Sequence, residues 1–213
     1  MRFVWFFVSG VVLLSFAASL YALPRLPDRI ASHWNAAWEV DGYVPKTPGV
    51  FLVPLISAAI AVLFAVIPAV DPMKANFESF RRYYDGFVAL MVLFMLGIHV
   101  QTLLWNLGFR VGFNFTMPVG LGVLFYYVGV LCEHSKRNWF VGIRTPWTMS
   151  SDRVWDRTHR VGGRLFKVSG LVAFAGVLAG EYAFYLIIVP VVLTAAYTTV
   201  YSYLEFRREA RGL

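Results

Sequence analysis

The chain alternates between long apolar runs and shorter polar segments. A helix needs about 20 apolar residues to cross the roughly 30 Å hydrocarbon core of a bilayer. Six runs approach or reach that length, so the pattern predicts six transmembrane helices. Their ranges are Phe3–Leu23, Val50–Val70, Gly86–Asn106, Phe113–Cys132, Leu165–Gly180 and Tyr182–Leu204.

The first and fifth runs need separate treatment. The first run is longer than the roughly 7–15 apolar residues of a secretory signal, so we expect it to remain as a span. The fifth run is short, and Gly162–Lys167 is expected to extend it, because basic side chains bury their stems and keep their charge in water. Only Glu181 separates the last two runs, which predicts a tight hairpin of helices.

Polar and small residues inside the runs predict contacts between helices. His99 lies in an apolar run, where a polar side chain is costly unless it faces the bundle. A hydrogen bond across helices is favoured there over a proton relay. Glycines in the last three runs are expected to pack within the molecule rather than mediate dimerisation. The spacing of Gly176 and Gly180 suits close approach of two helix backbones.

The polar segment 133–164 separates the fourth and fifth runs, and it is more elaborate than a connector needs. Three of the seven tryptophans lie in it, at Trp139, Trp147 and Trp155. A Thr145-Pro146 step adds rigidity, because the residue before a proline is biased away from helix. These features predict a structured loop rather than a solvated linker.

A short helix is predicted in the second half of this loop. Ser150 and Ser151 precede Asp152, which is typical of a serine N-cap with an acid in the first turn. Gly162-Gly163 predicts a break before the fifth span. Helical spacing sorts the side chains into three faces. These are an inward face of Val154, Thr158 and Val161, a basic stripe of Arg153, Arg157, Arg160 and Arg164, and a face of Asp152, Asp156 and His159.

The basic stripe suits anionic lipid head groups, at about 1 kcal/mol per basic residue near the surface. Lipid binding alone does not account for the tryptophans or for the turn at Arg144. Two roles stay open for Arg144. It forms a structural ion pair with Asp152 or Asp156, because a guanidinium binds a carboxylate in two places, or it contacts a ligand.

The acidic face is also a candidate cation site. Asp152, Asp156 and His159, together with Glu133 and His134, carry oxygen and nitrogen ligands. Their spacing matches no zinc motif, and the chain has no phosphate loop or serine nucleophile motif. We therefore predict no metal, no cofactor and no catalytic residue.

The outer segment 24–49 contains four prolines. Asp41-Gly42 between apolar and aromatic residues predicts a two-residue hairpin turn. Residues 28–34 are expected to form one or two helical turns before it. Trp34, Trp38 and Tyr43 suit an aromatic belt at the membrane interface, and a ligand-contacting role stays open beside it.

Composition and charge place the chain in a membrane. It is 59% apolar and 15% charged, against roughly 25% charged in a soluble domain. Fifteen basic residues lie on the side of the two termini and of segment 133–164, and four lie on the other side. Because cytoplasmic loops carry the excess of basic residues, both termini and this loop are predicted to be cytoplasmic. The net charge of +7 then reflects topology, so direct nucleic-acid binding is not predicted.

The residues of this loop closely resemble a family signature. The matching stretches are Asn138–Thr148, Ser151–Trp155 and Thr158–Gly163, and they resemble the SdpI family of small prokaryotic multi-pass membrane proteins. The outer segment resembles the short domain that precedes the signature in many relatives. The family usually has proline near Ala31 and glycine near Trp38, so this chain departs from the pattern at that turn.

The resemblance implies a function, which is immunity to a secreted toxin peptide, transmembrane signalling, or both, in some members through capture of a cytosolic repressor. Expected partners are membrane lipids, an extracellular toxin peptide and a cytosolic repressor protein, at the plasma membrane. Two sets of binding residues are predicted. The first is the signature loop, with Asn138, Gly142, Arg144, Thr145, Pro146, Trp147, Asp152, Trp155, Asp156 and His159; the second is the outer segment, with His33, Trp34, Asn35, Asp41 and Lys46.

The sequence therefore predicts an all-α integral membrane protein with six transmembrane helices, cytoplasmic N and C termini, and a structured cytoplasmic loop between the fourth and fifth helices. Two halves are expected. The first is residues 1–106 with the outer segment 24–49, and the second is residues 107–213 with the signature loop 133–164.

The alternative function is a transporter or a membrane-embedded enzyme acting on a lipid or amphiphile. Enzymatic activity stays open, with a non-enzymatic role favoured.

Overall fold

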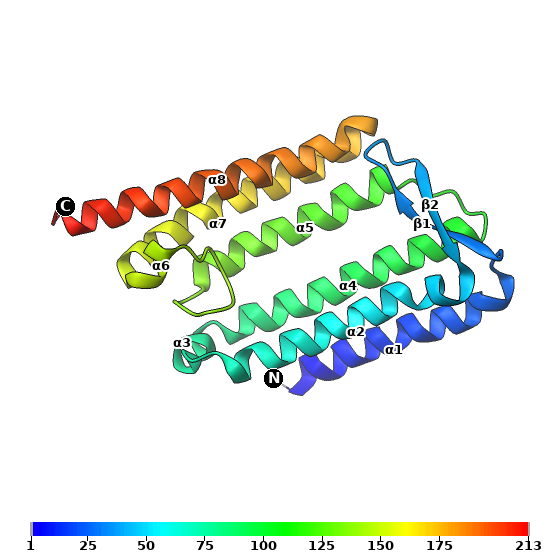
Figure 1. The fold of residues 1–213 in the computed structure, drawn as a ribbon, viewed down its shortest axis with the longest axis horizontal. Helices are drawn as coiled ribbons and strands as arrows, with labels where there is room; N and C mark the ends of the chain where they lie inside the picture. Colours follow the sequence, from blue (N-terminus) through cyan, green and yellow to red (C-terminus); the bar gives the residue numbers. More distant parts are fainter. Residues whose placement is uncertain (1, 213) are drawn as a thin grey trace.

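The computed structural model describes residues 2–212. Six long helices lie side by side in a bundle, and a β-hairpin lies across one end (Figure 1). All six are long and apolar enough to cross a membrane, which confirms the prediction of a multi-pass membrane protein. They are α1 (Arg2–Ala22), α2 (Lys46–Val70), α4 (Arg81–Asn106), α5 (Phe113–His134), α7 (Asp152–Ala175) and α8 (Ala183–Ala210).

Shorter elements connect these helices. We call the end that carries α3 and α6 the loop end, and the opposite end the hairpin end (Figure 1). The connecting elements are η1 (Leu23–Arg25), β1 (Arg29–Trp34), β2 (Val40–Pro45), α3 (Lys74–Ser79), α6 (Pro146–Ser150), η2 (Gly176–Leu178) and η3 (Gly180–Tyr182).

The first three long helices share an aromatic core near the loop end. Phe77, Phe80 and Tyr84 are fully buried, and the Phe77 ring centroid is 4.8 Å from that of each of the other two. The Tyr84 hydroxyl donates a hydrogen bond to the carbonyl oxygen of Phe64 over 2.7 Å. The short helix α3 therefore fastens α4 to α2.

A buried histidine joins the same three helices toward the hairpin end. The Ser19 hydroxyl oxygen lies 2.9 Å from His99 Nε2 and donates to the carbonyl oxygen of Val50 over 2.8 Å. His99 and Ser19 are both buried. The expected hydrogen bond of His99 across helices is confirmed.

Helices α5 and α7 pack closely through four glycines. A Cβ atom on Gly170 would lie 2.6 Å from the carbonyl oxygen of Gly122, and one on Gly163 would lie 2.8 Å from that of Gly129. Side chains do not fit at such distances, so glycine is required for this approach. The expected packing of glycines within the molecule is confirmed here.

Helix α7 runs unbroken through Gly162-Gly163, so the predicted break at that pair is wrong. These glycines serve close packing instead, because Gly162 lies under the Ile143 side chain and Gly163 under α5. The predicted cap is confirmed, since the Ser151 hydroxyl accepts the Val154 N–H over 3.3 Å. The helix therefore continues from the signature loop into the fifth span without interruption.

Helices α7 and α8 form the expected tight hairpin, but its connection differs from the prediction. Because α7 ends at Ala175, Gly176 and Gly180 lie in the turn rather than within one helix. Gly180 has φ +56°, and a Cβ there would meet nothing within 4 Å, so this glycine supplies a left-handed turn conformation. The predicted close approach is therefore found only at Gly176, which is buried within ordinary contact distance of Pro118 in α5 and Ala183 in α8, and not at Gly180.

The outer segment is an antiparallel hairpin of β1 and β2, an addition to the predicted all-α fold. Residues 29–34 form a strand, so the expected helical turns are wrong. The turn lies at residues 35–39, and Asp41-Gly42 lies inside β2. The Asn35 side-chain oxygen accepts hydrogen bonds from the N–H groups of Ala37 and Glu39, over 2.9 Å and 3.0 Å. These bonds form the turn ahead of Asp41, so the predicted turn at Asp41-Gly42 is wrong.

The Asn106 side chain helps to dock this hairpin on the bundle. Asn106, the last residue of α4, accepts the N–H of Ala31 over 2.7 Å and donates to the carbonyl oxygen of the same residue over 3.0 Å. The amide thus pairs with β1 as a neighbouring strand would. Ile30 and Ala31 are buried against the helices below.

The glycine contact can be tested with one methyl group. Gly170→Ala should destabilise the bundle by about 1–3 kcal/mol, because the added carbon meets the α5 backbone. Gly97→Ala in α4 is the matched control, since its Cβ would meet nothing within 4 Å. Thermal unfolding in one detergent measures both. Equal melting temperatures for the two variants would contradict the close contact.

Candidate functional site

In the structure the signature loop comprises residues 135–151, between α5 and α7, because residues 152–164 of the predicted loop belong to α7. Asn138 organises its first turn. The Asn138 side-chain oxygen accepts the N–H groups of Phe140 and Val141, over 2.9 Å and 2.6 Å. Its side-chain nitrogen donates to the carbonyl oxygens of Lys136 and Val141, over 2.8 Å and 2.9 Å. Asn138 is completely buried. Aspartate would lack the two donors, so the turn requires the amide.

A second buried side chain ties this loop to the first half of the bundle. Asp71, directly after α2, accepts the N–H of Met73 over 2.7 Å and that of Trp139 over 3.0 Å. Nearby, the Asn76 side chain donates to the carbonyl oxygen of Arg137 over 2.9 Å. The α2–α3 connection therefore holds the start of the signature loop.

Trp155 and His159 of α7 lie beneath the loop and are buried. Their rings stack 3.9 Å apart at an angle of 16°. The Trp155 indole N–H donates to the carbonyl oxygen of Ser135 over 3.0 Å. Ile143 donates its backbone N–H to His159 Nε2 over 2.9 Å, and His159 Nδ1 lies 2.9 Å from the carbonyl oxygen of Trp155. Nε2 must accept and Nδ1 must donate, so the imidazole is neutral.

Gly142 lies directly above this histidine. It has φ +115°, a conformation that side chains rarely adopt, and a Cβ there would clash with His159 Nε2 and crowd Trp155. Glycine at this position lets the backbone cover the imidazole closely enough for the hydrogen bond from Ile143.

The Thr145-Pro146 step begins the short helix α6. Thr145 is its N-cap, with Pro146 at the first helical position and a reciprocal pair of bonds between Thr145 and Thr148. The Thr145 hydroxyl also lies 3.0 Å from that of Ser202 in α8. Trp147 packs on Tyr203, with ring centroids 5.1 Å apart. The predicted rigid turn is thus attached to the last helix.

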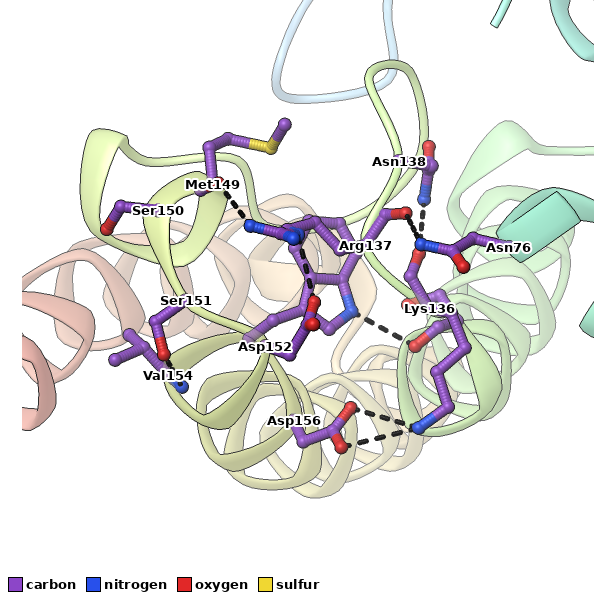
Figure 2. A network of polar contacts seen from close by, with 12 residues as sticks. Asn76, Lys136, Arg137, Asn138, Met149, Ser150, Ser151, Asp152, Val154 and Asp156 are labelled. Atoms are coloured by element: carbon purple, nitrogen blue, oxygen red, sulfur yellow. Dashed lines mark hydrogen bonds and ion pairs between the residues drawn. The ribbon is translucent and has the colours of Figure 1, made fainter. Parts of the chain in front are cut away.

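Acidic residues of α7 face basic residues of the loop, as Figure 2 shows. Arg137 Nε lies 2.9 Å from an Asp152 oxygen, and its guanidinium donates to the carbonyl oxygen of Met149 over 2.9 Å. Lys136 Nζ lies 3.2 Å from the nearer oxygen of Asp156. These four charged residues and Asn76 surround a polar cavity of about 200 Å³.

The expected ion pair of Arg144 with Asp152 or Asp156 is wrong, because Arg137 and Lys136 occupy those carboxylates. Arg144 is exposed and donates to the carbonyl oxygen of Trp139. Both aspartate side chains reach solvent, whereas His159 is buried below Ile143. The predicted face of Asp152, Asp156 and His159 therefore does not converge on one point.

Arg157 is not a free member of the basic stripe. Its guanidinium lies 2.6 Å from a carboxylate oxygen of Glu205 in α8, and Arg208 lies 2.7 Å from the other oxygen. Glu205 is only 2% exposed, so both partners compensate a buried charge. Arg157 thus joins α7 to α8, while Arg160 and Arg164 are exposed.

The predicted outer residues lie at the opposite end of the bundle (Figure 1). His33 Nδ1 is 2.5 Å from Asp41 across the hairpin, and Lys46 Nζ is 3.0 Å from Asp28. Asn35 closes the turn. The Trp34 ring packs against the helices, 4.3 Å from Phe113 between centroids.

The structure thus separates the two predicted sets by the length of the bundle. Sequence reasoning missed several residues that build them, because the contacts join segments far apart in the chain. These are Asp71, Asn76, Lys136, Arg137 and Ser202 at the loop end, and Asn106 and Phe113 at the hairpin end.

Comparison with known proteins adds a second line of evidence. Residues 135–202 match the model of the SdpI/YfhL protein family, and residues 10–58 match a domain of unknown function, DUF1648. The chain is 25% identical to "Immunity protein SdpI" of Bacillus subtilis (strain 168) over 199 residues, which cover 93% of each chain. No solved structure matches the chain significantly.

Proposed function

Because the chain is a member of the SdpI family, as its signature loop predicted, we propose that it gives its host immunity to a secreted toxin peptide. The observation that carries this proposal is the similarity to an immunity protein along nearly the whole chain. That similarity includes the segments that form the outer hairpin and the signature loop, so it is not confined to generic apolar helices.

We further propose that the protein lies in the plasma membrane with both termini and the signature loop in the cytoplasm. The asymmetry of basic residues supports this orientation. The hairpin that carries His33, Trp34, Asn35, Asp41 and Lys46 then faces the outside, and we propose that an arriving peptide contacts this hairpin. The two halves, residues 1–106 and 107–213, each contribute three spans and one of these surfaces.

The exposed surface of the signature loop, which includes Trp139, Phe140 and Arg144, is proposed to bind a cytosolic repressor and so to signal from the membrane to the cytosol. Trp139 is 51% exposed and Phe140 is 39% exposed, although both belong to a loop whose backbone is tightly fixed. Exposed aromatic residues beside an arginine, here Arg144, are typical of protein interfaces. Because the loop is already ordered, binding of a partner there would cost little conformational entropy.

The orientation can be tested by cysteine labelling. In a background with Cys132 replaced, Ser150→Cys should resist an impermeant thiol reagent in intact cells, and Ala37→Cys should react. Both positions are exposed, so burial does not protect either one. Labelling at position 150 with none at position 37 would reverse the proposed topology.

Immunity can be tested by complementation. Bacillus subtilis cells lacking their own immunity protein should survive toxin-producing neighbours when they express this chain. The toxin should be recovered intact after incubation with the purified protein, because protection is proposed to occur without hydrolysis. Death of the cells despite normal membrane abundance would contradict the proposal, and recovery of cleaved peptide would indicate an enzyme instead.

The role of Arg144 on the signature loop can be tested with two conservative variants. Arg144→Lys keeps the charge but loses the planar fork, so signalling to the cytosol should fall at unchanged membrane abundance. Arg160→Lys on the exposed stripe is the control and should be silent. A reporter gene controlled by the repressor measures both. Full reporter response with Arg144→Lys would exclude Arg144 from the docking surface.

A further inference from the structure

Two arginines of the basic stripe, Arg160 and Arg164, lie on the exposed face of α7. They are four residues apart in the helix, so their side chains are neighbours on one face. Within residues 2–212, neither guanidinium forms a hydrogen bond, an ion pair or a ring contact with the protein. Arg157, which precedes them on the stripe, is bound to Glu205. This face therefore presents two positive charges that no described group of the protein neutralises.

The acidic residues near this face are already bound by other basic residues. Asp156, one turn before Arg160, lies 3.2 Å from Lys136 Nζ. Glu133 of α5, which packs against Gly163, is bound to Lys167. A partner for the two arginines is therefore expected to be an anion from outside the protein.

The same face of α7 continues directly into an apolar surface. Val168 and Leu171 follow Arg164 by four and seven residues in an unbroken helix, so they lie on its face. They are 55% and 61% exposed. Because α7 is long and apolar enough to cross a membrane, these side chains are expected to meet acyl chains. The partner of this surface therefore combines a negative charge with an apolar chain.

The spacing along α7 places both arginines at the level of the lipid head groups. The apolar run begins at Leu165, directly after Arg164 and one turn further from Arg160. The two α-carbons lie roughly 1.5 Å and 7.5 Å outside this run along the helix axis. The head-group layer adds roughly 5–8 Å to each side of the hydrocarbon core. Helical side chains lean toward the N-terminal end of their helix, which for α7 is the loop end, so both guanidiniums extend toward the phosphates.

We propose that Arg160 and Arg164 form a site for an anionic phospholipid, whose phosphate accepts hydrogen bonds from both guanidiniums and whose acyl chain lies along Val168 and Leu171. Arginine suits this role because its planar fork donates two parallel hydrogen bonds to a phosphate. A free phosphate would leave the apolar face unused. The site depends neither on toxin immunity nor on which side of the membrane the loop end faces, and its test uses no toxin.

The site can be tested by native mass spectrometry of the full chain in detergent micelles, titrated with phosphatidylglycerol or with phosphatidylcholine of the same acyl chains. Phosphatidylglycerol should bind more tightly, because it carries a net negative charge. Combining Arg160→Gln with Arg164→Gln should raise the dissociation constant of phosphatidylglycerol by roughly tenfold or more, as expected for the loss of two basic residues at the head groups. The dissociation constant of phosphatidylcholine should change much less.

A variant that removes two exposed charges elsewhere is the matched control. Lys74→Gln combined with Arg211→Gln lowers the net charge by the same amount at the loop end and should leave phosphatidylglycerol binding unchanged. Melting temperatures confirm that each variant is folded. If the double variant of α7 does not fold, Arg160→Gln and Arg164→Gln are measured singly, and each should weaken binding by roughly threefold or more.

Four results would overturn the proposal. The first two are equal affinity for the two lipids and an equal loss of affinity in the control variant. The third is displacement of the lipid by glycerol phosphate at the same concentration, which would show that the arginines bind a free phosphate. The fourth is tighter binding of a polyglutamate peptide through the same arginines, which would indicate an acidic protein partner.

Discussion

The hydrogen bond from the Ile143 N–H to His159 Nε2 fixes the signature loop to the helix below it, and much of the loop end depends on it. A loop folded against a membrane-spanning bundle must satisfy its buried backbone groups internally, because water is excluded there. Asn138 and Asp71 satisfy the neighbouring N–H groups in the same way. These side chains hold the backbone of an irregular segment in one conformation.

The glycine contact between α5 and α7 continues the close packing from the loop end along the bundle. Since α7 continues from the loop into the bundle, Trp155 and His159 lie on the same helix as Gly163 and Gly170. Helix α8 runs alongside α7 from the loop end to the hairpin end. The two surfaces proposed to function on opposite sides are thus joined by continuous, closely packed helices.

The length of the apolar runs predicted the six spans, and the Ser-Ser-Asp pattern predicted the Ser151 cap, because membrane length and capping are local constraints. Local patterns failed where contacts between distant segments determine the structure. Gly162-Gly163 predicted a break, but the pair serves close packing, and residues 29–34 form a strand because Asn106 and β2 pair with it. The predicted partner of Arg144 was also wrong, since the fold brings Lys136 and Arg137 to Asp156 and Asp152 through contacts that local patterns do not encode.

Nitrogen-15 NMR of the histidine side chains in the reconstituted protein tests whether the signature loop is held rigidly by its hydrogen bond to His159. A His159→Gln variant assigns the signals. We expect a neutral His159 at neutral pH, with a proton on Nδ1 and with Nε2 unprotonated and accepting a hydrogen bond. A protonated Nε2, or rapid exchange between the two tautomers, would contradict it.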